Sequence, residues 1–216
     1  KWSVDHFDMK LLTLEKQTVP IRFKNPLIKI DGDAEVDLLI TWENKNFDFT
    51  GSIFAENLNI FSDISDISNN NNLIAENKLD MSVTTDLLLK VGTHAALNFN
   101  PLLRCVFVPH TTIKCKLDTQ SNFYQLDGSL QLKSGDVAYL SRNFYIKEGN
   151  IKFNPQDITN PLVTIRAETR EKDSNGDNVR IILSAENQYL LDFNPRFSSV
   201  PAKSENEIRL LLGQIV

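Results

Sequence analysis

The chain has 216 residues, of which 41% are hydrophobic, and its 23 basic and 28 acidic side chains give a net charge of −5. This is enough chain for one domain with a sizeable core. The acidic balance excludes the electrostatic footprint of a nucleic-acid-binding protein, and no apolar run is long enough for a membrane-spanning helix. The sequence begins at Lys1 without Met or a signal peptide, so we expect residues 1–216 to be a single-domain fragment of a longer protein.

Residues 28–42, IKIDGDAEVDLLITW, alternate between apolar and mostly charged side chains. The positions three and four residues after Ile28 are Asp31 and Gly32, which excludes an amphipathic helix. Strict alternation predicts a strand with one apolar face, and at about 3.3 Å per residue this strand extends for roughly 50 Å. Its apolar face carries Ile28, Ile30, Val36, Leu38, Ile40 and Trp42.

The polar turn ENKN, residues 43–46, predicts that the next strand folds back on the first. Phe47, Phe49 and Ile53 alternate in phase beyond the turn. An antiparallel hairpin then brings both apolar sets to one face. The predicted pairs are Trp42 with Phe47, Ile40 with Phe49 and Val36 with Ile53.

The phase of the second strand slips by one residue before Leu58, which predicts a β-bulge near Glu56 or Asn57. Residues 62–78, SDISDISNNNNLIAENK, contain an Asn run and little to bury. We expect this segment to be a flexible loop between two parts of one sheet.

The same alternation continues to about residue 153 and predicts further long strands. KSGD at 133–136 and KEGN at 147–150 are interpreted as turns between strands, and SNGDN at 174–178 as a hairpin of undetermined register. The apolar positions that we assign to the same face are Met81, Val83, Leu87, Leu89, Phe107, Ile113, Leu126, Leu130 and Leu132.

One helix is predicted at the C-terminal end, over about residues 204–216. Ser204 followed by Glu207 forms the pattern of a capping box. Ile208, Leu212 and Ile215 then recur at helical spacing. The sequence therefore predicts an all-β protein, a long antiparallel meander closed by one amphipathic helix.

No residue pattern indicates catalysis, a cofactor or a metal. His6, His94 and His110 are far apart and match no metal-ligand spacing. The segment DSNGDN begins like a calcium loop, but Asn178 stands where the loop needs Gly. The carboxylates of the first long strand share one face, which we interpret as solvated. We expect a protein that is not an enzyme and uses no cofactor.

The two cysteines lie symmetrically about His110, the middle of the segment VPHTT. If this segment is a hairpin turn, Cys105 and Cys115 face each other at a separation that a cross-strand disulfide tolerates. The alternative is two reduced thiols that act as small core residues. The sequence leaves both alternatives open.

Long strands with one apolar and one charged face allow three arrangements. The apolar faces can meet as a sandwich core, can face lipid as in an outer-membrane barrel, or can line a curled sheet that stays partly open. Aromatic residues at strand ends are too sparse for the barrel. Strands of this length are unusual in a sandwich, which favours the open groove.

Residues 126–213 resemble the C-terminal domain of the TamB family. The resemblance runs through LDGSLQLKSGDVAYLSRNFYIKEGNIKFNPQDITNPLVTIRAE and resumes at FSSVPAKSENEIRLLLG, which enters the predicted helix. The segment NQYLLDFNPRF between these two stretches lacks a glycine that the family pattern has. Residues 1–125 show only compatible alternation.

The resemblance implies a β-taco, a long folded sheet with an apolar groove, in a periplasmic protein anchored in the inner membrane. It implies carriage of phospholipid toward the outer membrane, with the acyl chains in the groove, and an outer-membrane partner of the BamA and TamA class. The alternative is a scaffold or chaperone that helps outer-membrane β-barrel proteins insert by lending them a sheet edge.

Overall fold

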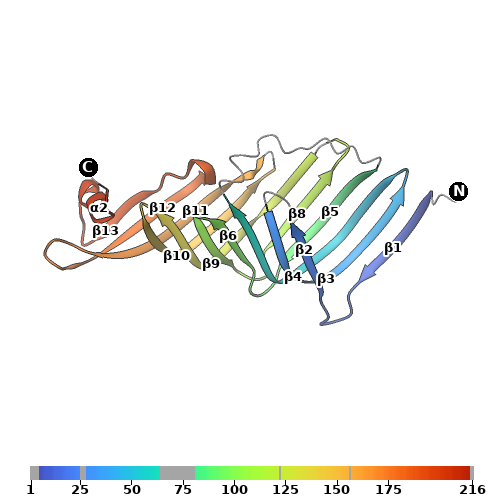
Figure 1. The fold of residues 1–216 in the computed structure, drawn as a ribbon, viewed down its shortest axis with the longest axis horizontal. Coiled ribbons are helices and arrows are strands. Elements are labelled where there is room, and N and C mark those ends of the chain that lie inside the picture. The colour runs from blue at the N-terminus through green and yellow to red at the C-terminus, as the bar shows by residue number, and fades with distance from the viewer. Residues whose placement is uncertain (1–4, 25–27, 64–80, 122, 156, 215–216) are drawn as a thin grey trace.

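The structure, a computed structural model, describes residues 5–24, 28–63, 81–121, 123–155 and 157–214. Most of these residues form one sheet, drawn in Figure 1 as a row of oblique strands from β1 near the N-terminus to β13 and helix α2 near the C-terminus. The elements are β1 His6–Leu12, β2 Val19–Lys24, β3 Ile28–Glu43, β4 Asn46–Asp63, β5 Ser82–Val91, β6 Ala96–Asn100, β7 Leu103–Phe107, β8 Thr112–Asp118, β9 Phe123–Tyr139, β10 Arg142–Asn154, β11 Asp157–Lys172, β12 Asn178–Tyr189, the 3-10 helix η1 Leu190–Asp192, β13 Arg196–Val200 and α2 Glu205–Leu211.

The prediction of a large curled sheet with one C-terminal helix is confirmed. The sheet runs from the edge formed by β1 and β2 to the edge formed by β13, and no pairing among the described residues joins the two edges. All pairs are antiparallel except two, because β4 runs parallel to both β5 and β6. Of the predicted loop at 62–78, Ser62 and Asp63 end β4 and the rest lies outside the described residues.

The first long hairpin has the predicted register. Trp42 pairs with Phe47, and the two other predicted pairs are also present. Asn44 and Lys45 form the turn with positive φ. The predicted bulge is present too, because the register shifts by one between the pairs of Asp31 and Asp33, and Asn57 has φ 48°.

Between β4 and β9 the sheet is filled by one long hairpin that is broken twice. β5 and β6 run along successive parts of β4, and β7 and β8 return along successive parts of β9. The breaks at 92–95 and 108–111 lie beside each other, joined by hydrogen bonds from Val91 N to Thr111 O (2.9 Å) and from Phe107 N to Ala95 O (2.9 Å). VPHTT is therefore not a hairpin turn. It separates β7 from β8, which run in the same direction along β9.

Two predicted turns are wrong. KSGD at 133–136 lies inside β9, and KEGN at 147–150 lies inside β10. Both are β-bulges, with register shifts opposite Val106–Phe107 and between Ile146 and Glu148. The real β9–β10 turn is at Leu140 and Ser141, with φ of 50° and 61°. A bulge and a turn both favour glycine beside polar residues, so composition alone confused them.

The predicted hairpin at SNGDN and the predicted helix cap are confirmed. SNGDN lies in the β11–β12 connection, and the register that the sequence left open pairs Lys172 with Asn178. Ser204 caps α2 with the predicted capping box. The α-helix is shorter than predicted and ends at Leu211, with Gly213 in a positive-φ conformation after it.

Backbone irregularities line up across the sheet and form what we call the crease. Each is joined to the next by hydrogen bonds or register, for example Asn57 N to Thr93 O (3.0 Å) and Val108 N to Gln131 O (2.8 Å). Bulges bend a strand and increase its twist, so a row of them bends the sheet along one line. The crease comprises positions 57, 92–95, 108–111, 131–135, 147–150, 164 and 187.

Glycine allows close approach of the strands within the sheet. Gly51 has φ +134°, and a Cβ built there lies 2.1 Å from the carbonyl oxygen of Asp37 on β3. Gly51 pairs with Leu38 and Leu87, so it sits on the apolar face. A side chain at this position would push apart the hairpin that carries the longest apolar face.

We predict that Gly51→Ala lowers the free energy of unfolding by at least about 3 kcal/mol, from backbone strain and overlap together. Gly176→Ala is the matched control, because Gly176 also has positive φ (87°) but nothing lies within 4 Å of its Cβ position. It should cost only about 1 kcal/mol. Urea unfolding measures both, and equal losses would contradict the crowding at Gly51.

Candidate functional site

One apolar face continues across the whole sheet. The register places Ile40 beside Phe49, Leu87 beside Cys115 and Phe144 beside Val137, so the alternation of each strand stays in phase with its neighbour. Where the alternation of a strand slips by one residue, a β-bulge takes up the extra residue and returns the apolar side chains to the same face. The sheet curls around this face, which we call the inner face, and turns its charged face outward.

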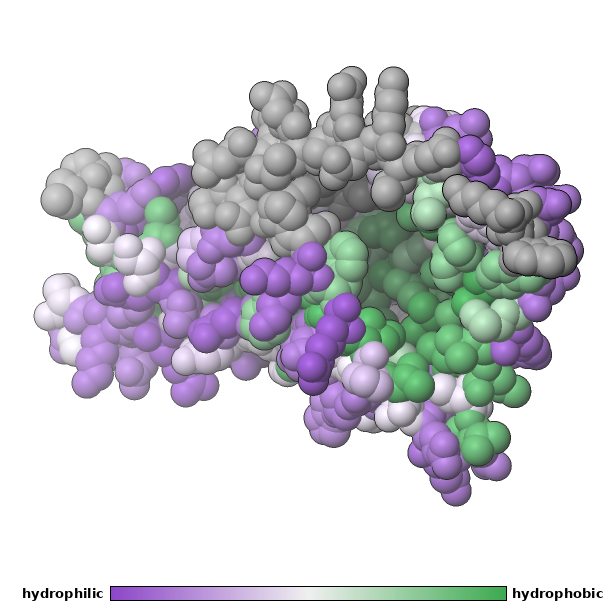
Figure 2. Space-filling view, turned by 45° about the vertical axis from the view of Figure 1, so that its right-hand side comes forward, coloured by the Kyte–Doolittle hydropathy of each residue, from purple (hydrophilic) through white to green (hydrophobic). Residues whose placement is uncertain are grey.

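The inner face is hollow toward the N-terminal edge. Figure 2 shows a hollow at this end, lined by hydrophobic residues and bordered by hydrophilic ones. Met9, Leu11 and Phe23 on the edge strands are 48%, 42% and 51% exposed. Within this part Val36, Leu38 and Ile40 are buried, at 6–9% exposure, so the exposed apolar surface belongs mainly to the edge strands around them. We call this part of the inner face the open section: Phe7, Met9, Leu11, Val19, Ile21, Phe23, Ile30, Val36, Leu38, Ile40, Trp42, Phe47, Phe49, Ile53, Val83, Leu87 and Leu89.

The inner face is filled toward the C-terminal edge. Val163 and Ile165 of β11 and Ile181 and Leu183 of β12 are at most 2% exposed. They belong to one large core cluster with residues of β6, β7, β9, β10, η1 and α2. We call this part the closed section, and it is an ordinary protein core.

The predicted groove residues divide between the two sections. Phe107, Ile113, Leu130 and Leu132 are 1–7% exposed and lie in the large core cluster. Leu126 is half-buried and packs against the same cluster. The other predicted residues on strands lie on the inner face of β3, β4 and β5, where contact with a ligand stays a prediction.

Two predicted residues need separate mention. Ile28 pairs with Ser62 in the backbone register, and its side chain lies outside the described part. Met81 precedes β5 rather than belonging to it, and it is 44% exposed.

Sequence reasoning missed the two edge strands. Phe7, Met9 and Leu11 alternate in HFDMKLL, and Ile21 and Phe23 alternate in VPIRFK. The register places them on the inner face, opposite the apolar positions of β3. The signal was present but short, with three or fewer apolar positions in each strand.

Aromatic rings gather where the strands of the open section end beside the β3–β4 turn, which we call the lip. Trp42 and Phe47 lie 4.5 Å apart between ring centroids, and Phe7 and Phe49 lie 6.2 and 6.1 Å from Phe47. All four are on the inner face, next to the β3–β4 turn. Trp combines an apolar body with a polar N–H, which suits a boundary between apolar and aqueous surroundings.

The outer face of the same strands is charged and solvated. The carboxylates of Asp31 and Asp37 are half exposed and form long ion pairs with Arg22 (3.7 Å) and Lys10 (3.3 Å). Exposed ion pairs of this kind contribute little stability but keep the outer face hydrated. Among the described residues, no group of three or more His, Cys, Asp or Glu could hold a metal ion.

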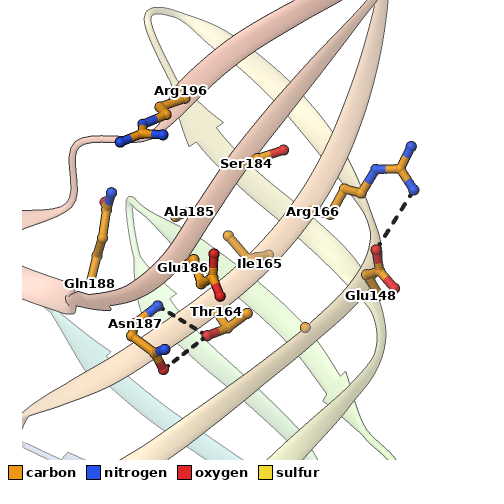
Figure 3. A pocket seen from close by; sticks show the side chains of 11 residues that line it. Glu148, Thr164, Ile165, Arg166, Ser184, Ala185, Glu186, Asn187, Gln188 and Arg196 are labelled. Atoms are coloured by element: carbon orange, nitrogen blue, oxygen red, sulfur yellow. Dashed lines mark hydrogen bonds and ion pairs between the residues drawn. The ribbon is translucent and has the colours of Figure 1, made fainter.

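A depression of about 680 Å³ lies on the outer face of β10–β12 (Figure 3). It follows the bulge at Asn187, whose backbone N–H donates to Thr164 Oγ1 (3.1 Å). Arg166 and Glu148 form an ion pair beside it (3.6 Å). Most of its lining residues are polar or charged, and it lies on the face opposite the apolar groove.

The cysteines do not face each other. Cys105 on β7 pairs with Gly135 and Cys115 on β8 pairs with Leu126, so the two occupy distant points along β9. This separation of about 30 Å far exceeds the reach of a disulfide. Both thiols are free, which makes the disulfide alternative wrong.

The family model of the TamB C-terminal domain matches residues 61–215. The chain belongs to the TamB C-terminal domain family. None of the curated proteins compared with it matches. In the described part of this TamB-family domain, no helix has the length and apolar character needed to cross a membrane.

We predict that both thiols react slowly in the folded protein. Burial raises the pKa of Cys105 to about 12 and that of Cys115 to about 11, so little thiolate forms at pH 8. Alkylation by iodoacetamide at pH 8 should be at least about 100-fold slower than in urea. Mass spectrometry after unfolding without reductant should count two modified thiols, and a count below two would contradict the free-thiol assignment.

Proposed function

We propose that this TamB-family domain carries phospholipid between the inner and outer membranes, with the acyl chains held in the open section. The observation that supports this best is the set of large apolar side chains left uncovered on one side of a hollow, with Phe23 51% exposed and Met9 48% exposed. A soluble surface rarely leaves a contiguous apolar patch uncovered unless it binds something apolar. The charged outer face suits the aqueous space between two membranes.

The physical need for such a groove is large. Each methylene exposed to water costs about 0.8 kcal/mol, so two sixteen-carbon tails with about 30 methylenes cost around 24 kcal/mol. An apolar groove offsets most of this cost without a specific lock, because the hydrophobic effect is non-directional. Transport then needs a continuous apolar surface rather than catalysis, and the domain is proposed not to be an enzyme.

The proposal includes a location and partners. The protein works in the periplasm, is anchored in the inner membrane and supports outer-membrane biogenesis together with a BamA- or TamA-class outer-membrane protein. Membership of the TamB family supports this setting.

A second candidate function is a scaffold for the insertion of outer-membrane β-barrel proteins. The free edge of β1 favours it, since β1 pairs only with β3 among the described strands. Adding a strand there would use backbone hydrogen bonds. Such a scaffold tolerates polar residues on the inner face, whereas a lipid groove does not, so inner-face substitutions separate the two functions.

We predict that Leu11→Asp reduces the phospholipid that co-purifies with the protein about tenfold, because an uncompensated carboxylate against acyl chains costs at least about 1.4 kcal/mol. Leu11 lies on the inner face opposite Leu38 and is 42% exposed, so the change should leave the fold intact. Lipid extraction with mass spectrometry measures the bound lipid, and circular dichroism checks the fold.

Leu12→Asp is the matched control. Leu12 is the next residue on β1, is 58% exposed and pairs with Asp37 of the charged face, so urea unfolding is measured for both variants to separate any charge repulsion at this pair from an effect on lipid. It should retain the lipid content of the wild-type protein. Equal lipid content in the two variants would contradict the lipid groove and favour the scaffold. Normal growth of cells whose only copy of the protein carries Leu11→Asp would do the same.

We also predict that Trp42 reports bound lipid directly. The chain has two tryptophans, so Trp2→Phe leaves Trp42 as the one emitter. Phospholipid with brominated acyl chains should quench at least about half of its fluorescence, since quenching by bromine needs near contact and the ring lies at the lip of the open section. The same lipid without bromine is the control, and equal emission with both lipids would overturn the placement of acyl chains there.

A further inference from the structure

The inner face passes from open to filled along a single sheet. Met9 and Leu11 at the N-terminal edge are 48% and 42% exposed, whereas Val163 and Ile181 are at most 1% exposed. All four belong to the same face, because the register carries one alternation from strand to strand. The difference therefore lies in what covers the face.

The chain's own C-terminal segment covers part of the closed section. Ile208 and Leu212, in and just after α2, are 1% exposed, and Leu190 of η1 is 6% exposed. All three belong to the core cluster of the closed section. Phe193 packs against this cluster, with its ring centroid 6.0 Å from that of Tyr139. These side chains present to the sheet the same apolar surface that acyl methylenes would present.

Polar contacts fix the start of α2 over the end of the sheet. Lys203 Nζ pairs with the Asp173 carboxylate at 2.9 Å, in the β11–β12 connection. The Lys203 backbone N–H donates to Ser199 Oγ (2.9 Å), and Glu207 accepts from the Ser204 backbone N–H (2.8 Å). The helix is thus anchored at one end and attached to the face by two buried apolar side chains.

We propose that α2 is the end stop of the acyl-chain site. This inference rests on the proposed function and adds where the site ends: acyl chains bind along the open section, on β1–β5, and do not enter the closed section while Ile208 and Leu212 occupy it. Phospholipid consequently enters and leaves at the open section, including its N-terminal edge, and the C-terminal end admits it only if α2 moves away.

The test compares two phenylalanines that differ only in section. Phe49 and Phe197 are both half-buried and both lie on the inner face, opposite Ile40 and Leu183 respectively. Each is replaced in turn by the photo-crosslinker p-benzoylphenylalanine in the intact protein in living cells. Phe54, half-buried on the outer face and stacked on His110, gives the background.

After irradiation, lipid adducts are measured by mass spectrometry. The probe at Phe49 should give at least tenfold more phospholipid adduct than the probe at Phe197, which should match the background at Phe54. Comparable adducts at Phe49 and Phe197 would overturn the end stop while leaving the lipid groove in place. Background adduct at all three positions would overturn the proposed function itself.

A second arm removes the stop. Ile208→Asn with Leu212→Asn takes away the apolar surface of α2, and adduct at the Phe197 probe should rise at least fivefold. Leu210→Asn is the matched control, since Leu210 lies on the same helix but is 58% exposed. If the double variant raises the adduct no more than Leu210→Asn does, while circular dichroism shows an intact sheet, the end stop is wrong. If the sheet is lost, the wild-type comparison of Phe49 with Phe197 still decides.

Discussion

An apolar face on one side of a single sheet has to be covered by something. In a sandwich a second sheet does this, but the described strands of this protein all belong to one sheet. The sheet covers part of the face by curling along the crease, and the C-terminal segment covers another part. What neither can reach stays open to solvent or to a ligand. Groove and core are therefore two outcomes of one constraint, on the same strands.

The β3–β4 hairpin was predictable in detail because two independent signals agreed there. Alternation fixed the faces, and the turn at Asn44 and Lys45 fixed the register, so Trp42 had only one partner consistent with both. The helix was predictable for a similar reason, since the capping residues and the apolar spacing gave the same start at Ser204. Where a local signal and a pattern coincide, sequence is sufficient.

The middle of the sheet was not predictable, because glycine beside polar residues is typical of both β-bulges and turns. Gly135 marks a bulge in β9, whereas the real turn uses Leu140 and Ser141, a pair without glycine, asparagine or proline. The placement of Cys105 and Cys115 failed in the same way, since a break at VPHTT looks like a hairpin until the partner strand is known. Alternation also cannot tell a lined groove from a packed core. The difference depends on what covers the face, and part of that cover is provided by Ile208 and Leu212, which are distant in sequence from the strands they contact.

The edge strands β1 and β2 have a consequence for how the molecule behaves in solution. An edge strand presents unpaired backbone N–H and C=O groups. A second chain can pair with them and start an aggregate, especially where one face of the strand is apolar. Pro20 removes one amide donor from that edge, and Lys10, Arg22 and Lys24 set positive charges along it. These residues obstruct self-pairing without altering the inner face. The apolar side chains of β1 and β2 can thus stay exposed to water without promoting pairing between molecules.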